Sequence, residues 1–292
     1  MKTVLVNKPI HSDAIRRLGE EAEVLTPFDM PSKEVLKLLE EVHGLILCAG
    51  LNISNDDLDR FSMLEVIGRH GVGIDYVDLQ AVTERGIPLV FTPEGPTEST
   101  AEHAFLLMLA AARKLSLLDR ATRAGEFHIR DRIVGRELRG IKVGVVGFGR
   151  IGKRFAEMCR EALSAPVYAF DPYQTKAEVE AWRAVYMSDL VDMASKVDVL
   201  SIHCPLTPET TRLVNKDVIA AMKPDAYVIN TSRGAIVDEP ILVQALAEGR
   251  LAGAGLDVYG QEPPPADHPL FALDNVVLTP HLASFTDEGR RR

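Results

Sequence analysis

The 292-residue sequence has only three cysteines, no long apolar run and no excess of basic charge. Cys48, Cys159 and Cys204 are odd in number and far apart. They therefore argue against a disulfide framework or a metal site and favour a reducing, cytoplasmic location. No stretch of about 18 uncharged apolar residues occurs, so we expect no membrane span. The formal net charge of −9 argues against nucleic acid as a partner.

The remaining composition is that of a globular protein, with 46% hydrophobic and 26% charged residues. The length suggests two domains at about 150 residues each. Short apolar runs alternate with amphipathic stretches in two blocks, which predicts an α/β protein with parallel sheets. The expected strands are residues 3–6, 45–47, 64–68 and 88–91 in the first block, and 141–146, 167–170, 197–201, 227–230, 252–256 and 276–278 in the second.

Helices are expected between these strands. In the first block they are residues 13–20 capped by Ser12, residues 56–61 capped by Ser54 or Asn55, and residues 78–85. A linker with two prolines and a glycine, residues 92–97, separates the blocks. It leads into residues 99–123, a long helical stretch rich in Ala, Leu and Met that is apolar on more than one face. We expect this helix to be buried between domains or subunits.

The segment IKVGVVGFGRIG, residues 141–152, is the most informative local motif. An expected strand leads into Gly147-x-Gly149-x-x-Gly152, and a helical stretch follows, which is the context of a dinucleotide-binding fingerprint. Gly147 permits a tight turn, Gly149 lets the backbone approach a pyrophosphate, and Gly152 allows close packing of helix on strand. The helix N-terminus offers N–H groups to phosphates, and Arg150 can add a full charge.

An acidic residue follows at the distance that this fingerprint requires. The next expected strand leads into Asp171, nineteen residues after Gly152. A carboxylate there would bind a ribose diol and repel a 2′-phosphate, which predicts NAD rather than NADP. A turn aspartate before Pro172 is the alternative. Because the fingerprint begins mid-chain, a separate domain precedes the cofactor domain, and a cleft between the two is the default ligand site.

Three further segments carry titratable side chains after expected strands. Arg233, in VINTSRG, could grip a carboxylate through two parallel hydrogen bonds. Glu262 follows Asp257 in GLDVYGQEP, and His281 lies in LTPHLAS. A histidine beside a carboxylate can act as acid or base near neutral pH. Each residue alone could be a surface charge or a strand-end cap, whereas three of them along one sheet favour a catalytic set.

Other histidines have a weaker claim. His203 also follows a strand and is interpreted as structural, because the backbone of Cys204 and Pro205 is better suited to face the nucleotide. His70 and His103 could line the cleft, although local hydrogen bonding is the simpler interpretation.

Together these segments resemble the D-isomer-specific 2-hydroxyacid dehydrogenase family, in its D-3-phosphoglycerate dehydrogenase-like branch. The resemblance runs from about residue 44 to residue 286. The matching segments are GRHGVGIDYVD at 68–78, AEH at 101–103, the glycine loop, HCPLTP at 203–208, NTSRGAIVD at 230–238, GLDV at 255–258 and TPHLA at 279–283. The resemblance implies a Rossmann NAD-binding domain, residues 98–284, inserted into a flavodoxin-like substrate domain, residues 1–97, with parallel sheets in both.

The resemblance also implies roles for matching residues. Arg233 would bind the substrate carboxylate and polarise the 2-oxo group, His281 would exchange the proton, and Glu262 would hydrogen-bond His281. Asp257 would meet the carboxamide of the cofactor. The implied substrate-binding residues are Val72, Gly73 and Arg233. The implied cofactor-binding residues are Gly147, Gly149, Arg150, Ile151, Gly152, Asp171, Cys204, Pro205, Thr231, Ser232 and Asp257. No metal ion is expected.

The expected function is NAD-dependent hydride transfer between nicotinamide and a small D-2-hydroxy or 2-oxo acid, of the 3-phosphoglycerate, hydroxypyruvate or glyoxylate type. Formate oxidation is disfavoured because that branch lacks a glutamate at the position of Glu262. Phosphite oxidation is disfavoured because its lysine would fall at Val72. The alternative is a non-catalytic NAD(H)-sensing, protein-binding module of the same fold. A homodimer through the 99–123 helix and the NAD domain is also implied.

Some residues depart from the family pattern. Pro96 and Tyr76 stand where members often have asparagine, and both changes could reshape the substrate pocket or hinge. Members normally continue after the Pro-His segment into a helix that returns to the first domain. Here only eleven residues follow His281, so residues 285–292 are expected to begin this return with a helix that is missing or rudimentary.

Overall fold

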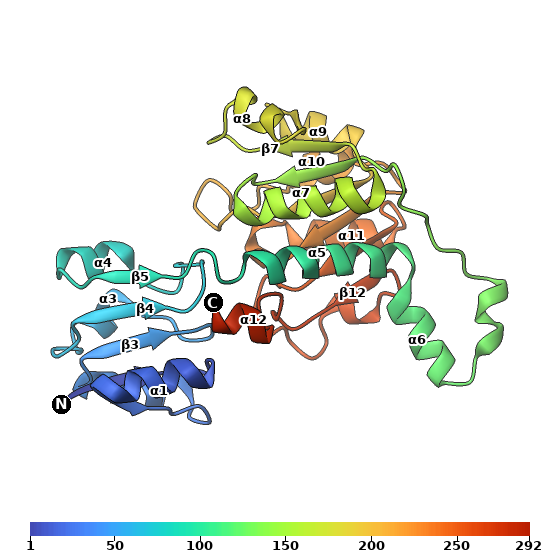
Figure 1. Ribbon diagram of the computed structural model, residues 1–292. Helices are drawn as coiled ribbons and strands as arrows, with labels where there is room; N and C mark the ends of the chain where they lie inside the picture. Colours follow the sequence, from blue (N-terminus) through green and yellow to red (C-terminus); the bar gives the residue numbers. More distant parts are fainter. The chain divides into compact units, whose positions relative to one another are not determined.

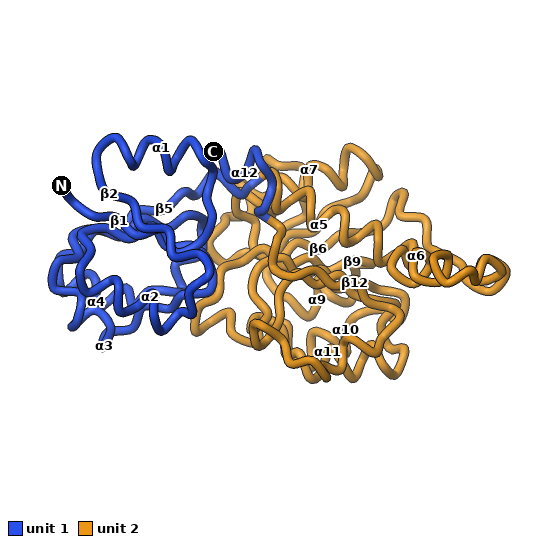
Figure 2. Tube along the Cα trace, turned by 90° about the horizontal axis from the view of Figure 1, so that it is seen from below, with its two compact units in different colours: residues 1–97, 284–292 blue, residues 98–283 orange.

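Two parallel β-sheets organise the chain, one in each of two units. The structure is a computed structural model that describes all residues, 1–292. Unit 1 comprises residues 1–97 and 284–292, and unit 2 comprises residues 98–283 (Figure 2). Unit 2 is therefore inserted into the sequence of unit 1. The expected α/β class with parallel sheets is confirmed.

Unit 1 has a five-stranded sheet in the order β2-β1-β3-β4-β5, which is the flavodoxin-like order. Its strands are β1 (Lys2–Val6), β2 (Ala22–Leu25), β3 (Gly44–Leu47), β4 (Val66–Arg69) and β5 (Leu89–Phe91). Its helices are α1 (Ser12–Glu21), α2 (Ser32–Leu38), the 3₁₀ helix η1 (Leu39–Glu41), α3 (Asn55–Leu58), α4 (Leu79–Glu84) and α12 (Asp287–Arg291). Leu5, Leu45 and Ile67 on the central strands are fully buried in its core.

Unit 2 has a seven-stranded sheet in the order β12-β11-β10-β9-β6-β7-β8, which is the doubly wound order of dinucleotide-binding folds. Its strands are β6 (Val143–Val146), β7 (Val167–Phe170), β8 (Val185–Tyr186), β9 (Val199–Ile202), β10 (Tyr227–Asn230), β11 (Gly253–Leu256) and β12 (Val276–Leu278). Its α-helices are α5 (Thr97–Ala112, whose first residue belongs to unit 1), α6 (Leu115–Arg123), α7 (Arg150–Leu163), α8 (Lys176–Ala181), α9 (Leu190–Lys196), α10 (Lys216–Ala221) and α11 (Glu239–Ala247). Three 3₁₀ helices complete it: η2 (Phe127–Asp131), η3 (Gly234–Ile236) and η4 (Pro269–Ala272).

Helices cover both faces of this second sheet (Figure 1). Tyr227 and Ile229 of β10 pack with α5 and α7, whereas Val228 packs with α9, α10 and α11. Successive residues of a strand point to opposite faces, so the continuous apolar run of β10 serves two cores. None of the helices has the length and apolar composition to cross a bilayer.

The expected single helix over residues 99–123 is divided in two. Lys114 adopts a left-handed conformation with φ of +53°, and α6 begins after it. The carbonyl oxygen of Ala112 accepts the N–H of Arg136 instead of continuing a helical ladder. Gly135 lies against Arg113, since a Cβ on that glycine would be 3.2 Å from the Cα of Arg113. The packing of residues 135–136 thus accompanies the interruption of the helix at Lys114. No sequence feature within residues 99–123 predicts this interruption.

The caps of two helices in unit 1 can be compared with expectation, and one of them differs. The cap of α1 is His11, whose Nδ1 accepts the N–H of Asp13 at 3.2 Å, and Ser12 is the first helical residue. Of the two candidate caps for α3, Ser54 is the cap and forms a capping box with Asp57, whereas Asn55 is the first helical residue. After Ser284 the chain forms the short helix α12, and Arg292 at its end donates to the carbonyl oxygen of Gly95 at 3.2 Å.

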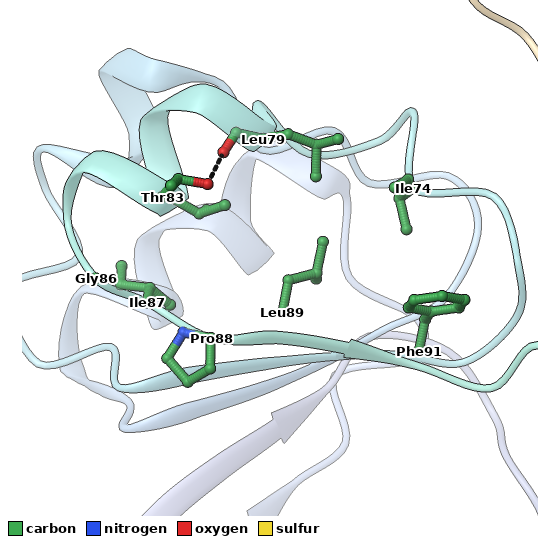
Figure 3. A pocket seen from close by; sticks show the side chains of 9 residues that line it. Ile74, Leu79, Thr83, Gly86, Ile87, Pro88, Leu89 and Phe91 are labelled. Carbon is green, nitrogen blue, oxygen red and sulfur yellow. Dashed lines mark hydrogen bonds between the residues drawn. The ribbon is translucent and has the colours of Figure 1, made fainter.

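Unit 1 also has a hollow of about 460 Å³ between α4 and β5 (Figure 3). Its lining is mostly apolar and includes Leu79, Leu89 and Phe91. None of the lining residues titrates, so this hollow offers no groups for acid–base chemistry.

Candidate active site

The predicted site residues of unit 2 lie at the carboxyl ends of its strands. Gly147 follows β6, Asp171 follows β7, Cys204 follows β9, Thr231, Ser232 and Arg233 follow β10, Asp257 follows β11, and His281 follows β12. Because the strands are parallel, these ends meet at one edge of the sheet. The strand order separates this edge into a glycine-rich half at β6 and β7 and a titratable half at β10, β11 and β12.

The loop between β6 and α7 leaves an open position for an anion. Gly149 is the N-cap of α7, and no side chain caps the first turn. A Cβ on Gly149 would meet no atom within 4 Å, whereas a Cβ on Gly147 would lie 2.5 Å from the backbone N of Cys204. A Cβ on Gly152 would lie 2.2 Å from the carbonyl oxygen of Gly147. The loop therefore requires glycine for close packing, and its uncapped N–H groups fit a pyrophosphate.

Asp171 supports the glycine loop directly. Its Oδ2 accepts the N–H of Phe148 at 2.7 Å, and its Oδ1 accepts the N–H of Tyr173 at 2.9 Å. Each carboxylate oxygen keeps a lone pair, which leaves Asp171 able to accept from a ribose diol. Arg150 and Ile151 lie in the first turn of α7, and the Arg150 side chain is exposed.

The turn after β10 is organised by Asn230, a residue that the sequence analysis left without a role. Its buried side chain accepts the N–H of Ser232 at 3.0 Å and donates to the carbonyl oxygen of Arg233 at 2.9 Å. Ser232 in turn donates its hydroxyl to the carbonyl oxygen of Cys204. Thr231 has a buried hydroxyl oxygen without a hydrogen-bond partner. Pro205, at the exposed end of the neighbouring loop, accepts the Thr210 hydroxyl at 2.7 Å through its carbonyl.

These features fit a dinucleotide. The uncapped helix terminus suits phosphates, the Asp171 carboxylate suits a ribose, and the unpartnered Thr231 hydroxyl needs a polar group from outside the chain. No group of three or more His, Cys, Asp or Glu side chains could hold a metal ion.

Close backbone packing brings the loop of Arg233 beside the loop of Glu262. A Cβ on Gly234 would lie 2.0 Å from the backbone carbonyl of Tyr259, so only glycine permits this approach. The Arg233 guanidinium donates to the carbonyl oxygen of Ser232 at 2.8 Å. Its charge is also one of the influences that lower the pKa of Glu262.

His281 and Glu262 form a hydrogen-bonded pair. The Nδ1 of His281 lies 2.6 Å from Oε2 of Glu262, and Oε1 of Glu262 accepts the N–H of Tyr259 at 3.1 Å. Burial alone would raise the pKa of Glu262, but the hydrogen bond with His281 and the nearby positive charges outweigh it and lower the pKa. Glu262 is therefore an acceptor, which assigns the proton to Nδ1 and leaves Nε2 of His281 for exchange with a substrate.

Asp257, whose side chain is fully buried, bonds to the segment that carries His281. Its Oδ1 accepts the hydroxyl of Thr279 at 2.6 Å and the N–H of Leu282 at 3.0 Å, and its Oδ2 accepts the N–H of Ala283 at 2.8 Å. Its backbone carbonyl accepts the N–H of His281 at 2.8 Å. Asp257 thus holds the turn that carries His281, while the predicted contact with a carboxamide stays a prediction.

In unit 1 the predicted residues Val72 and Gly73 lie in the loop after β4. Arg69 at the end of β4 shapes this loop, because its Nε donates to the carbonyl oxygen of Gly73 at 2.7 Å. It also donates to the carbonyl oxygens of His70 and Leu47. Sequence reasoning missed Arg69, because the burial that marks its role is visible only in the structure.

His203, His103 and His70 differ in their surroundings. His203 interacts with the Ser201 hydroxyl through Nε2 at 2.9 Å, and burial lowers its pKa to about 3. It is therefore neutral near pH 7 and adds no charge to the phosphate site. His103 lies on α5, and its Nε2 is 3.0 Å from the Thr279 hydroxyl. Burial, together with the positive charges of Arg69 and Arg290, lowers the pKa of His70.

A model of the NAD-binding domain of the D-isomer specific 2-hydroxyacid dehydrogenases matches residues 105–283. The chain belongs to the D-isomer specific 2-hydroxyacid dehydrogenase family. The match lies within unit 2, so unit 2 carries the NAD-binding domain of this dehydrogenase family.

The chain is similar over nearly its whole length to two curated relatives and one solved structure. D-3-phosphoglycerate dehydrogenase of Archaeoglobus fulgidus is 41% identical over 290 residues, which cover 98% of the chain and 54% of the relative. Hydroxypyruvate reductase of Thermotoga maritima is 33% identical over 99% of the chain and 94% of the relative. A crystal structure of a protein from Thermus thermophilus superposes with a TM-score of 0.89 at 39% identity, over 99% and 92% of the two chains.

The chain spans about half the length of the first of these relatives. The two curated relatives are named as enzymes, so these comparisons do not favour the non-catalytic sensing alternative.

Proposed function

We propose that this chain catalyses the NAD-dependent interconversion of a small D-2-hydroxy acid and its 2-oxo acid. The observation that carries the proposal is the 2.6 Å pair of His281 and Glu262, which shares one sheet edge with Arg233 and an uncapped glycine loop. A base with an orienting carboxylate, a guanidinium and a dinucleotide site are the groups that this chemistry needs.

In the proposed reaction the nicotinamide would supply or accept the hydride at the substrate C2. Arg233 binds the substrate carboxylate and polarises the 2-oxo group through its fixed pattern of donors. His281 gives its Nε2 proton to the oxygen in reduction and takes it back in oxidation. Glu262 keeps the imidazole oriented and stabilises its charged form. Arg233 and protonated His281 together stabilise the negative charge that develops on the oxygen.

The remaining assignments are proposals of the same kind. Unit 1 is the substrate domain and contributes Val72 and Gly73 to the carboxylate site. The predicted cofactor residues of unit 2 hold NAD, and Asp171 selects it over NADP. The acid is of the 3-phosphoglycerate, hydroxypyruvate or glyoxylate type, which the names of the two curated relatives support in part. Three unpaired, buried cysteines support a reducing, cytoplasmic location.

The testing experiment follows NADH oxidation by absorbance with glyoxylate, hydroxypyruvate, 3-phosphohydroxypyruvate, pyruvate and 2-oxoglutarate. Each acid is repeated with NADPH. Turnover of at least one acid, faster with NADH, is the expected result. Tight NADH binding without turnover of any acid would overturn the catalytic proposal and return weight to a sensing role.

A further inference from the structure

Two histidines outside the proposed catalytic set are linked by chains of hydrogen bonds to the segments that carry His281 and Glu262. His103 belongs to α5 and His268 precedes η4. Their side chains are 11% and 9% exposed, respectively, so neither is open to solvent like a surface group. Each histidine begins a short chain of hydrogen bonds that leads toward one member of the His281–Glu262 pair.

The first chain runs from His103 to the turn of His281. The Thr279 hydroxyl lies 2.6 Å from Oδ1 of Asp257 and 3.0 Å from Nε2 of His103. A threonine hydroxyl has one proton, and the carboxylate can only accept, so this proton goes to Asp257. Nε2 of His103 must then carry a proton and donate it to the hydroxyl oxygen. His103 thereby completes the bonding of Thr279, two residues before His281.

Asp257 transmits this arrangement to the catalytic turn. Its side chain accepts the N–H groups of Leu282 and Ala283, and its backbone accepts that of His281. His281 has a φ of +54°, a left-handed conformation that a non-glycine residue adopts only when its surroundings support it. The bonds from Asp257 on both sides of this residue provide that support.

The second chain runs from His268 to the loop of Glu262. Nδ1 of His268 accepts the N–H of Leu270 at 3.3 Å, so Nε2 carries the proton and donates to Oε1 of Glu239 at 3.1 Å. The other oxygen of Glu239 accepts the N–H of Gly260 at 2.9 Å. Gly260 precedes Glu262 by two residues, so this bond fixes the loop from which Glu262 reaches His281.

Tyr259 connects the two chains. Its hydroxyl donates to the carbonyl oxygen of Thr279 at 3.0 Å, and its N–H donates to Oε1 of Glu262 at 3.1 Å. Burial raises the pKa of Tyr259 to about 12, so the hydroxyl keeps the proton that this bond requires. The His281 and Glu262 segments are therefore joined behind the reactive pair as well as by the pair itself.

We propose that His103 and His268 are positioning residues for the reaction assigned above. His103 acts through Thr279 and Asp257 on the orientation of His281, and His268 acts through Glu239 on the orientation of Glu262. The proposal rests on the proposed function, because it concerns the rate of the chemical step. Misplacing a catalytic group by about 1 Å can cost on the order of a hundredfold in rate.

The test compares alanine and glutamine variants of both residues. His103→Ala and His268→Ala remove the donor, whereas His103→Gln and His268→Gln keep an N–H that can reach the same acceptor. We expect each alanine variant to lower kcat by about tenfold or more, with the NADH dissociation constant within about twofold of wild type. Each glutamine variant should recover most of the lost kcat. His43→Ala is the control, since His43 is a half-buried histidine of unit 1 whose Nδ1 accepts the N–H of Thr3 and whose backbone bonds to Thr3 and Glu65.

Two results would overturn the proposal. One is alanine variants that match His43→Ala in kcat, and the other is glutamine variants that lose as much kcat as the alanine variants. The downfield proton NMR signal of the His281–Glu262 hydrogen bond, assigned by its loss in His281→Gln, is a readout that needs no turnover. If wild type reduces none of the acids, the proposed function fails. The positioning roles of His103 and His268 are then judged from this NMR signal alone. Its loss in the alanine variants and return in the glutamine variants supports the positioning roles, and its persistence in both alanine variants overturns them.

Discussion

Nδ1 of His281 lies 2.6 Å from Oε2 of Glu262, although nineteen residues separate them in the sequence. The two side chains come from the loops that follow adjacent strands, β12 and β11. Their contact depends on the parallel pairing Leu256↔Leu278, which aligns the ends of these strands. A strand pairing thus brings together a base and the carboxylate that orients it.

Replacing Glu262 by glutamine tests the importance of the carboxylate charge. Glu262→Gln keeps an oxygen that can accept from Nδ1 but cannot stabilise a positive imidazole, so kcat should fall by about tenfold to a thousandfold. Steady-state kinetics with the preferred acid measures the change. Glu248→Gln, at an exposed position paired with Arg250, is the matched control. A kcat equal to that of this control would contradict the role of Glu262.

Arg233→Ala should abolish turnover and leave NADH binding largely intact, because the guanidinium is assigned to the substrate. Loss of a bidentate charged contact is expected to reduce kcat/KM by about a hundredfold or more. Kinetics gives the first quantity, and a fluorescence titration with NADH gives the second. Arg233→Lys should recover little, since an ammonium cannot form two parallel bonds. Near-normal turnover in the alanine variant would end the assignment.

Much of the architecture could be predicted from local patterns. The strands at 167–170, 227–230 and 276–278 have the predicted bounds, because short apolar runs between turn signals mark strands of a covered parallel sheet. β2, α2 and β8 were not predicted. β8 has only two residues, and α2 begins at Ser32 without a side-chain cap, so neither has a strong local signal. The break at Lys114 accompanies contacts with residues 135 and 136, which no pattern within the helix contains.

Asp171 provides a test of cofactor selectivity with a charge-only substitution. Asp171→Asn can still accept the N–H of Phe148, as the carboxylate does at 2.7 Å, but it no longer repels a 2′-phosphate. We expect the ratio of kcat/KM for NADH over NADPH to fall by about tenfold or more, mainly through the KM for NADPH. Asp189→Asn is a control, because Asp189 caps α9. An unchanged ratio would count against the ribose assignment.

The homodimer that the family resemblance implies can be tested at the surface of α5 and α6. Leu106 is 52% exposed, Leu115 is 53% exposed, and Phe127 in the following 3₁₀ helix is 61% exposed. Apolar side chains of this size are expected to be covered in an assembly. Sedimentation should give a dimer at micromolar concentration, and Leu106→Asp should shift it toward monomer. Val191→Asp on α9 should not. A clean wild-type monomer would refute the dimer.

The site itself was predictable only in part. Gly147, Arg233 and His281 could be predicted because each is a glycine or a chemically active residue that follows an expected strand. His103 and Thr279 are 176 residues apart, and His268 reaches Glu239 across 29 residues. Such bonds exist only after the sheet has assembled, so no spacing rule contains them. The residues that would react could be predicted from sequence, whereas those that hold them in place required the structure.

The buried imidazole of His203 makes stability depend on pH. Burial lowers its pKa from 6.5 in a model compound to about 3. Below pH 6.5 the imidazole therefore binds a proton in the unfolded chain, whereas in the folded chain it stays neutral until the pH is near 3. Stability therefore falls as the pH is lowered through this range. His203 alone should reduce the free energy of unfolding by about 2 kcal/mol between pH 7.5 and pH 5.

Urea unfolding of wild type and His203→Gln at these two pH values, at one protein concentration, measures this contribution. Fluorescence of Trp182, the only tryptophan, follows unit 2, which contains both residues. His203→Gln is expected to be less stable than wild type at pH 7.5, because the replacement disturbs a packed site beside Phe155. Its loss of stability between the two pH values should nevertheless be smaller by about 2 kcal/mol. Equal losses in both proteins would mean that His203 accepts a proton in the folded chain and is less enclosed than its unpartnered Nδ1 indicates.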